Sequence, residues 1–239
     1  MKSLVCLLSL VLLPVFSPFD APNASAAPRR EYTVISGGVA LRSWENLRIP
    51  PLRHDRWWGN FIRPARVRIE KLRKMHGPSA QITWLVYRRA YARRASEEGR
   101  PLLDFIRSVR DKYNVRLVWY ETGQDVIDYI NRGMNRNRVK IANFDYYGHS
   151  NRHCFLFDYS SDILGASKCF LHEIQLKGLR RGSFARGAHV QSWGCHTGES
   201  MSKSWKKATG VKMWGAIGKT DYSSGTVPFL SSPGGRWVR

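Results

Sequence analysis

The sequence predicts an α/β fold in which a mostly parallel sheet of about five strands carries helices on both faces. Two observations support this prediction. Short apolar runs alternate with segments whose apolar residues recur at helical spacing, with short connections between them. The apolar runs are also continuous, as in strands that are covered on both faces. Right-handed crossovers would then place all carboxyl ends of the parallel strands along one edge of the sheet.

The amino terminus is typical of a targeting segment. Lys2 precedes an apolar run over residues 4–16, and the small-residue site Ala24-Ser25-Ala26 follows it. We therefore expect a signal peptide over residues 1–26, with cleavage before Ala27. The apolar run is short for a membrane span, and no other stretch approaches one. The mature protein is expected to be periplasmic or secreted, without a transmembrane segment.

The chain is strongly basic, with 39 Lys and Arg against 18 Asp and Glu and a formal net charge of +21. Such a charge favours solubility or attraction to an anionic envelope or surface polymer. No helix-turn-helix, zinc-finger or RNA-binding signature is present, so a specific nucleic-acid partner is not predicted. The hydrophobic share of 43% is enough to fill one core.

Three regions are expected after the signal peptide. Residues 27–79 are interpreted as a basic N-terminal arm with one helix, because they contain Gly37-Gly38, the breaker Pro50-Pro51 and a single helical pattern over residues 61–74. Residues 80–224 hold the α/β domain. Residues 225–239 are rich in Gly, Pro and Ser and are interpreted as a flexible tail, with an edge strand at 226–230 left open.

Within the α/β domain the elements follow in order. Pro101 is expected to open one helix, and Thr122 with Asp125 forms a capping box for the next. A third helix starts at Thr197 or Gly198 and stops at Gly210. The weaker patterns predict a strand or hairpin arm at 154–157 and a helix at 170–176. The strong strands are expected at residues 81–87, 115–120, 139–147, 188–193 and 211–217.

Three cysteines remain after removal of the signal peptide: Cys154, Cys169 and Cys195. An odd number in an exported chain leaves at least one thiol free or intermolecular. Cys154 and Cys169 would be the pair if a disulfide forms, but two buried free thiols are an equal alternative. Cys195 is expected to stay reactive.

Two consecutive strands end in a glycine followed by a residue that can do chemistry. The strand at 139–147 leads into Gly148-His149, and the strand at 188–193 leads into Gly194-Cys195. Because both ends lie at the same edge, we expect a nucleophilic thiol with a histidine base. The helix expected after Cys195 would favour its thiolate. Each residue alone is more simply explained by packing or a turn, whereas the pair favours chemistry.

The backbone N-H groups at Gly148, Gly194 and Cys195 are candidates for binding an oxyanion. His196 is a rival base, but adjacent residues at a strand end usually point apart. A zinc site is disfavoured, since Cys195-His196 with a distant His149 or His153 shows no recurring ligand spacing. We expect no metal and no cofactor.

The order of these residues, histidine first and cysteine second, resembles that of the caspase-like cysteine peptidases, which include caspases, gingipains, clostripain, legumain and separase. The matching motifs are YYGHSN around His149 and WGCHTGES around Cys195. The similarity covers residues 80–224, and its motifs are short. It implies a three-layer sandwich with the sheet from Ile82 to Ile217 as the scaffold.

The resemblance implies that Cys195 is the nucleophile and His149 the general acid and base. It places the oxyanion hole at the backbone amides of Cys195 and Ser150. Family members commonly carry Gly directly after the histidine, whereas this chain has Ser150 with Gly148 on the other side, which leaves an inactive homologue open. Asp145 and Asp158 are candidates for orienting His149, or they cap turns.

The resemblance also implies that substrate selectivity lies in residues 218–224, which include Thr220. Asp221 would favour a basic side chain of the substrate, and Lys219 an acidic one. The basic preference is favoured slightly, because gingipain-like and clostripain-like relatives cleave after basic residues. The expected function is an exported peptidase that acts on peptides or proteins through a thioester acyl-enzyme. The alternatives are a non-catalytic binding domain for an anionic surface partner, and another Cys/His acyl-transfer enzyme such as an amidase.

Overall fold

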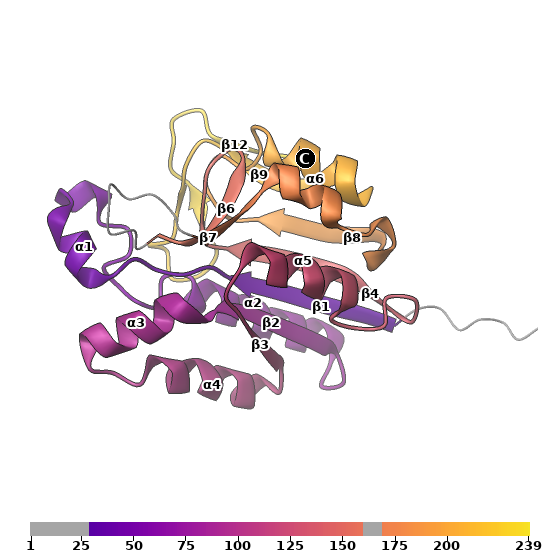
Figure 1. The fold of residues 1–239 in the computed structure, drawn as a ribbon, viewed down its shortest axis with the longest axis horizontal. Helices are drawn as coiled ribbons and strands as arrows, with labels where there is room; N and C mark the ends of the chain where they lie inside the picture. Colours follow the sequence, from indigo (N-terminus) through magenta and orange to yellow (C-terminus); the bar gives the residue numbers. More distant parts are fainter. Residues whose placement is uncertain (1–28, 160–168) are drawn as a thin grey trace, which may run out of the picture.

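The computed structural model describes residues 29–159 and 169–239, so the expected signal peptide lies outside the described residues. Its centre is a seven-stranded sheet with the order β12-β9-β8-β4-β1-β2-β3, in which only β12 is antiparallel to its neighbour. The expected α/β fold with a mostly parallel sheet is confirmed, and the sheet has seven strands rather than about five (Figure 1). The strands are β1 (Arg29–Ser36), β2 (Gln81–Tyr87), β3 (Arg116–Tyr120), β4 (Val139–Tyr147), β8 (Phe184–Ser192), β9 (Met213–Ile217) and β12 (Arg236–Val238).

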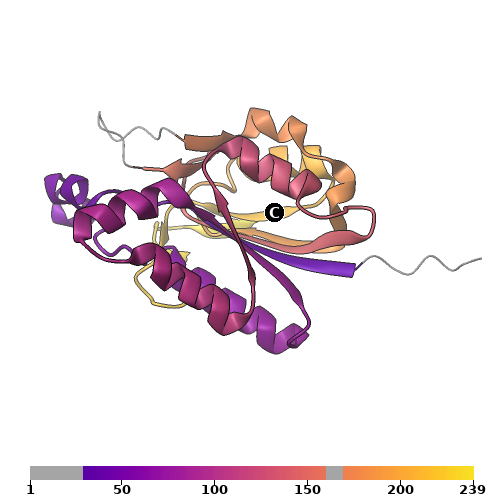
Figure 2. The ribbon, with the colours of Figure 1, turned by 60° about the horizontal axis from the view of Figure 1, so that its bottom comes forward.

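Helices cover both faces of the sheet (Figure 2). The face with α2 and α4 buries one apolar core over β1 and β2, and the face with α5 and α6 buries a second core over β4 and β8. The helices are α1 (Arg42–Leu47), α2 (Ile62–His76), α3 (Arg88–Glu98), α4 (Leu102–Tyr113), α5 (Gly123–Arg132) and α6 (Met201–Thr209).

The chain reverses its direction of travel through the sheet at the centre. It passes from β1 to β2 and β3, returns through α5 on the opposite face to β4 beside β1, and continues to β8 and β9. The connections that leave β1 and β4 therefore diverge to opposite faces. In open α/β sheets this switch point leaves a crevice outside the carboxyl ends of the strands, where ligands bind.

The prediction of an N-terminal arm over residues 27–79 is wrong, because the first described segment of this region, β1, is a central strand of the sheet. β1 pairs in parallel with β2 on one side and with β4 on the other. Val34 and Ile35 are almost fully buried in it. The strand starts with Arg29, Arg30 and Glu31, which conceals its apolar character in the sequence.

The buried charge of Glu31 is neutralised from a distant segment. Arg136 donates to one of its carboxylate oxygens, and the Tyr129 hydroxyl and Thr83 hydroxyl donate to the other. A charge at a buried strand position is tolerated only when it is paired and hydrogen-bonded in this way. Local patterning does not reveal such a partner.

The carboxyl-terminal segment is not a flexible tail. β12 extends the sheet antiparallel to β9, with Trp237 opposite Ala216. Ahead of it, β11 (Phe229–Leu230) pairs with β10 (Thr220–Asp221) in a two-stranded sheet. The edge strand left open at 226–230 therefore exists as β11, although it joins β10 and not the main sheet.

A third, three-stranded sheet consists of β5 (His149–Ser150), β6 (Cys154–Asp158) and β7 (Cys169–His172). The helix expected at 170–176 is therefore wrong: β7 comes first, and a 3-10 helix, η2 (Glu173–Gly178), follows it. In the β6–β7 register, Cys154 lies opposite His172 and Cys169 opposite Asp158. The two cysteines thus lie at opposite ends of the strand pair.

Other elements agree closely with the sequence prediction. β2 and α4 span the expected residues, and the capping box at the start of α5 is present, with Thr122 Oγ1 accepting from the Asp125 N-H at 3.1 Å. α3 was not predicted, since only Ala90, Tyr91 and Arg94 are buried in it. Among residues 29–159 and 169–239, no helix is both long and apolar enough to span a membrane.

Candidate functional site

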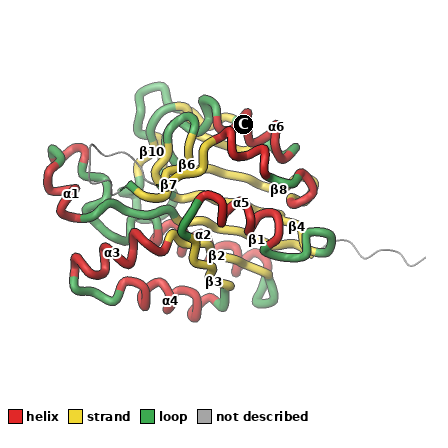
Figure 3. Tube along the Cα trace, viewed as in Figure 1, coloured by secondary structure: helices red, strands yellow, loops and turns green. Residues whose placement is uncertain are grey.

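A cavity of about 870 Å³ opens at the carboxyl edge of the sheet. Figure 3 shows loops and the short strands β6, β7 and β10 gathered at this edge, on the side of α1. His149 follows β4 and Cys195 follows β8, and both line this cavity, as do Gly148 and Ser150. The parallel topology thus brings the two sequence motifs into one site.

The imidazole of His149 is held by a carboxylate that sequence reasoning missed. Its Nε2 lies 2.6 Å from Oδ2 of Asp55, a residue with no exposed surface. The same Oδ2 accepts the Ala40 N-H at 2.7 Å, and Asn60 Nδ2 lies 3.4 Å from Oδ1. Because an ionised carboxylate only accepts, Nε2 carries the proton and Nδ1 keeps the lone pair.

The electrostatic balance keeps Asp55 ionised. Burial alone would raise the pKa of Asp55, but the charge of a protonated His149 and the hydrogen bonds from His149, Ala40 and Asn60 outweigh burial and hold this pKa below its ordinary value. Asp55 lies 94 positions before His149, in the loop between η1 (Pro50–Leu52) and α2. No local sequence signal marks it, apart from its being an acid within the basic run RHDRWW.

Two aromatic rings fix the plane of the His149 imidazole. Phe61 meets it edge-on with ring centroids 4.9 Å apart, and Tyr159 stacks on it at 4.2 Å. Together with Asp55, these contacts leave the imidazole little rotational freedom. A base whose direction is fixed in advance needs no reorganisation before proton transfer.

The sulfur of Cys195 is surrounded by Thr220, the first residue of β10. The Thr220 N-H donates to Sγ at 3.3 Å, and Thr220 Oγ1 lies 3.5 Å from Sγ. The Thr220 hydroxyl in turn donates to the Trp193 carbonyl at 2.8 Å. Cys195 lies in a turn, and α6 begins only at Met201, so the expected position next to a helix amino terminus is wrong. The N-H group aimed at the sulfur comes from Thr220 instead.

The ends of β4 and β8 are tied together by side-chain hydroxyls. Ser150 Oγ donates to the Cys195 carbonyl at 2.7 Å. A Cβ on Gly194 would lie only 2.1 Å from the same Ser150 Oγ. Glycine at position 194 is therefore required for this close approach. The Tyr222 hydroxyl accepts from the Gly148 N-H and donates to the Trp193 carbonyl, both at 3.1 Å.

The expected oxyanion donors differ in availability. The Gly148 N-H is bound to Tyr222, and the Gly194 N-H makes a long contact of 3.4 Å with Ser192 Oγ. The Cys195 N-H donates to no partner within the described part of the chain. Of these three N-H groups, it is the one left available to an oxyanion, while the Ser150 hydroxyl already donates to the Cys195 carbonyl.

Asp145 and Asp158, the acids expected to orient His149, have other partners. Asp145 is fully buried, pairs with Arg68 at 2.6 Å and accepts from Trp193 Nε1 at 3.0 Å. Asp158 pairs with Arg93 at 2.6 Å. The orienting role falls to Asp55, because a tertiary contact and not sequence proximity decides it.

His196 also lines the cavity, although it was expected to point away from Cys195. Its backbone has a positive φ of 62°, and its Nδ1 lies 2.6 Å from Oε1 of Glu199. Glu199 also accepts the Gly218 N-H at 3.2 Å. This second histidine–carboxylate pair is more exposed than that of His149, and Glu199 is further tied to Arg152.

The three residues expected to bind substrate all line the cavity: Lys219, Thr220 and Asp221. The Asp221 carboxylate accepts the Ser223 N-H at 2.6 Å. Lys219 is exposed. In the described ranges, no group of three or more His, Cys, Asp or Glu side chains is arranged to hold a metal ion.

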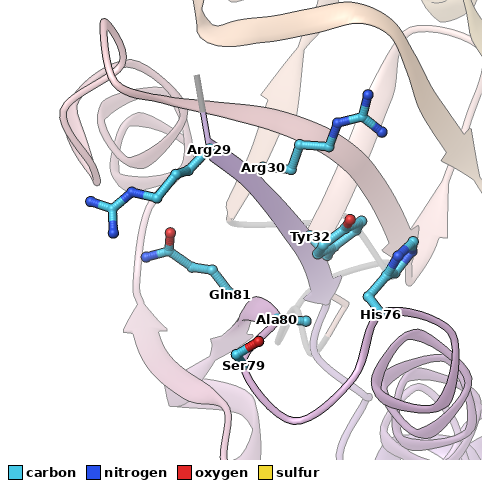
Figure 4. A pocket seen from close by; sticks show the side chains of 7 residues that line it. All are labelled: Arg29, Arg30, Tyr32, His76, Ser79, Ala80 and Gln81. Atoms are coloured by element: carbon cyan, nitrogen blue, oxygen red, sulfur yellow. The ribbon is translucent and has the colours of Figure 1, made fainter. Parts of the chain in front are cut away.

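A second cavity of about 580 Å³ lies at the opposite, amino-terminal edge of the sheet (Figure 4). It is lined by residues from the starts of β1 and β2 and the end of α2, with the Tyr32 ring stacked on His76 at 4.1 Å. The seven side chains around it include no thiol and no carboxylate. It therefore lacks the combination of thiol, imidazole and carboxylate found at the carboxyl edge.

Compared with known proteins, the chain matches no family model, no curated protein and no solved structure.

Proposed function

We propose that the protein is an exported cysteine peptidase in which Cys195 and His149 hydrolyse peptide bonds, with Asp55 orienting the histidine. The observation that carries this proposal is the pairing of His149 with a fully buried carboxylate at 2.6 Å, in the same cavity as a cysteine whose sulfur accepts an N-H. The order of the two motifs, which resembles that of the caspase-like peptidases, supports it.

In the proposed acylation step, Nδ1 of His149 takes the thiol proton and the sulfur of Cys195 attacks the substrate carbonyl carbon. The Cys195 N-H stabilises the charge that develops on the carbonyl oxygen. As the carbon–nitrogen bond breaks, His149 returns the proton to the leaving amine. The product of this step is a thioester on Cys195.

Deacylation reverses the roles. Neutral His149 takes a proton from water, which attacks the thioester carbon, and the carbon–sulfur bond breaks to release the acid and regenerate the thiol. Asp55 stabilises the imidazolium formed in both steps, since its carboxylate accepts from Nε2 throughout. The proposal that the protein is exported rests on the amino-terminal pattern of the sequence. The net charge of +21 would attract the protein to an anionic envelope polymer.

Selective alkylation tests the proposal. The mature protein is labelled with iodoacetamide from pH 5 to 9, and the modified cysteine is identified by intact and peptide mass. Burial raises the pKa of the Cys154 and Cys169 thiols to about 11, so these two residues are slow internal controls. We expect fast labelling at Cys195 near neutral pH that vanishes in Cys195→Ala and slows in His149→Ala.

Slow labelling of Cys195 would contradict the proposal. If Cys195 is labelled no faster than an ordinary thiol in unfolded protein, the site is not a nucleophilic one, and the basic surface becomes the candidate for function as a binding domain. If labelling is fast, panels of peptide and non-peptide acyl substrates separate a peptidase from an amidase or acyl transferase.

A further inference from the structure

The segment that runs from the end of α1 through η1 presents large apolar side chains to solvent. Leu47 is 78% exposed, Ile49 64% and Leu52 45%. No other run of six residues in the described ranges exposes three large apolar side chains. Single exposed apolar residues are common, whereas a cluster of them marks a surface that meets a partner. We call residues 47–52 the apolar turn.

The apolar turn is held in place by hydrogen bonds on both of its sides. Before it, the Glu97 carboxylate accepts the first two backbone N-H groups of α1, at 2.6 and 2.7 Å. After it, the Arg53 guanidinium folds back and donates to the carbonyls of Arg48 at 2.9 Å and Asn46 at 3.2 Å. A defined backbone therefore carries the exposed side chains, and their exposure is a feature of the fold.

The charges around the apolar turn are separated by sign. The only two acids of residues 41–58, Glu45 and Asp55, are buried, and Asp55 binds His149. Arg42 and Arg56 are exposed, and the side chain of neither makes a hydrogen bond or ion pair with any described residue. The surface of this segment is therefore apolar and positively charged.

This surface lies beside the candidate site. Figures 1 and 2 show α1 at the outer end of the molecule, beyond the main sheet. Three residues of the segment, Arg48, Leu52 and Arg53, also line the cavity that holds Cys195 and His149. A partner seated on the apolar turn is therefore next to this cavity.

Exposed aliphatic side chains together with unpaired arginines match the surface of an anionic lipid bilayer. Aliphatic side chains enter the boundary between headgroups and acyl chains, while arginines reach the phosphates. The net charge of +21 adds attraction at longer range. An acidic polysaccharide would use the charge but gain little from Leu47 and Ile49, and a second copy of the chain would meet like charge.

We propose that residues 42–56 dock the protein onto the surface of an anionic lipid bilayer. Leu47 and Ile49 enter the acyl boundary, and Arg42 and Arg56 bind lipid phosphates. Docking holds the neighbouring cavity at the membrane surface, where it meets molecules that are attached to the bilayer or lie on it. This inference goes beyond the proposed peptidase function and does not depend on it.

Vesicle co-sedimentation of the mature protein tests the apolar part of the proposal. We expect binding to vesicles of equimolar phosphatidylglycerol and phosphatidylcholine, and weaker binding to phosphatidylcholine alone. The double variant Leu47→Ser, Ile49→Ser should lower the partition coefficient at least about tenfold. The matched control is Met75→Ser, Ile174→Ser, which removes side chains that are 56% and 66% exposed on other elements and should leave it unchanged.

A second pair of variants tests the charges. Arg42→Gln, Arg56→Gln should lower the affinity for the anionic vesicles several-fold and change binding to phosphatidylcholine little. Lys203→Gln, Lys207→Gln makes the same change in net charge at exposed positions of α6. It should have a much smaller effect, because salt confines the attraction to charges close to the bilayer.

Three outcomes would overturn docking through the apolar turn. The first is absence of wild-type binding to the anionic vesicles. The second is unchanged binding in Leu47→Ser, Ile49→Ser, which would leave only general attraction by charge. The third is a wild-type dimer that this variant converts to a monomer in light scattering, which would assign the apolar turn to a second copy of the chain.

Iodoacetamide labelling keeps this proposal separate from the proposed peptidase function. Leu47, Ile49, Arg42 and Arg56 do not line the cavity around Cys195, so all these variants should label as fast as wild type. Slow labelling of Cys195 in a wild-type protein that binds vesicles would defeat the peptidase proposal and support docking. Rapid labelling without vesicle binding would do the reverse.

Discussion

At the scale of single residues, the direction of one imidazole decides what the site can do. Asp55 binds Nε2 of His149, while Phe61 and Tyr159 restrict the ring from two sides. Only Nδ1 is then left to take a proton. Asp55 itself accepts the Ala40 N-H, so the backbone fixes the position of the negative charge next to Nε2 of His149.

Replacing Asp55 by Asn tests this arrangement. An amide of the same shape lacks the negative charge of Asp55, so it no longer stabilises the imidazolium that forms when His149 takes a proton. We expect the rate of Cys195 acylation to fall by about a hundredfold, within the usual range for loss of general base catalysis. Asp104→Asn, at an exposed position on α4, is the control and should react like wild type. A similar rate in Asp55→Asn and wild type would contradict the role of Asp55.

Glu45 is expected to make the stability of the folded state depend on pH. It is buried and accepts the Asp55 N-H at 2.8 Å; burial raises its pKa above the ordinary value. The folded state therefore holds this proton more tightly than the unfolded state, and stability falls as pH rises above the ordinary pKa of Glu45. Asp55 acts in the opposite sense: its lowered pKa contributes stability above its ordinary value that is lost on acidification.

We expect Glu45→Gln to raise the melting temperature at pH 7 and to leave it nearly unchanged near pH 4, because the amide can still accept the Asp55 N-H. Melting curves between pH 4 and 8 measure this difference. Glu121→Gln, at a more exposed surface ion pair, is the control. A loss of stability in Glu45→Gln that appears only at the higher pH values would show that the ion pair with Arg48 outweighs the cost of burying the charge.

At the scale of elements, α3 anchors the loop that carries Asp55. Arg94 has no exposed surface, and its guanidinium donates to the carbonyls of Ala40, Asp55 and Arg56 at 2.6 to 3.0 Å. It also pairs with Glu98 at 2.6 Å. One side chain of α3 thus fixes both ends of the loop from residue 40 to residue 56.

We expect Arg94→Met to cost about 3 kcal/mol or more of the free energy of unfolding, since it leaves buried carbonyls without their donor and removes the shorter of the two ion pairs of Glu98. Guanidinium chloride unfolding provides the measurement. Arg107→Met, which breaks an exposed i, i+3 pair on α4, should change this free energy by no more than about 0.5 kcal/mol. Equal effects of the two substitutions would show that Arg94 does not anchor the loop.

The turn after β8 leads to another prediction. In Gly194→Ala the new Cβ would lie 2.1 Å from Ser150 Oγ, so the strand ends must move apart. We expect slower labelling of Cys195 and a stability loss of about 1–3 kcal/mol. Adding Ser150→Gly removes the obstructing side chain and should recover much of the stability. Gly178→Ala, whose Cβ would make ordinary contacts at 3.5 Å, is the control; a similar loss there would contradict the explanation.

At the scale of the whole molecule, the site lies at the point where the strand order of the sheet changes direction, between β1 and β4. The protein as a whole is also strongly cationic. A net charge of +21 on 239 residues repels itself in the compact state. Added salt screens this repulsion over distances of about 10 Å at 0.1 M. We therefore expect the melting temperature to rise between 20 and 300 mM NaCl.

The matched variant carries Lys203→Gln, Lys206→Gln and Lys207→Gln, all at exposed positions of α6. It should melt higher at low salt and respond less to NaCl than wild type. A melting temperature that falls with salt in wild type would indicate that favourable ion pairs outweigh the repulsion. Binding to anionic polymers, measured on the same two proteins, should weaken with salt and with the substitutions.

Much of the fold was predictable because its signals are local. The continuous apolar run of β2 and the Thr122–Asp125 box at the start of α5 depend on neighbouring residues only. The glycines that end β4 and β8 marked His149 and Cys195, and the rule that parallel strands share an edge predicted that the two would lie close together. The sequence by itself therefore determined the α/β class and the histidine and cysteine at its edge.

Other features depended on contacts between distant segments. β1 could not be recognised as central because Glu31 becomes tolerable in the core only through Arg136, 105 positions later. Asp55 could not be identified as the partner of His149, because the two residues are 94 positions apart in the sequence. Asp145, which is close to His149 in the sequence, forms an ion pair with Arg68 instead. Only the tertiary structure decided these partners, since the burial and pairing of a charge are properties of the packed chain and leave no periodic pattern along it.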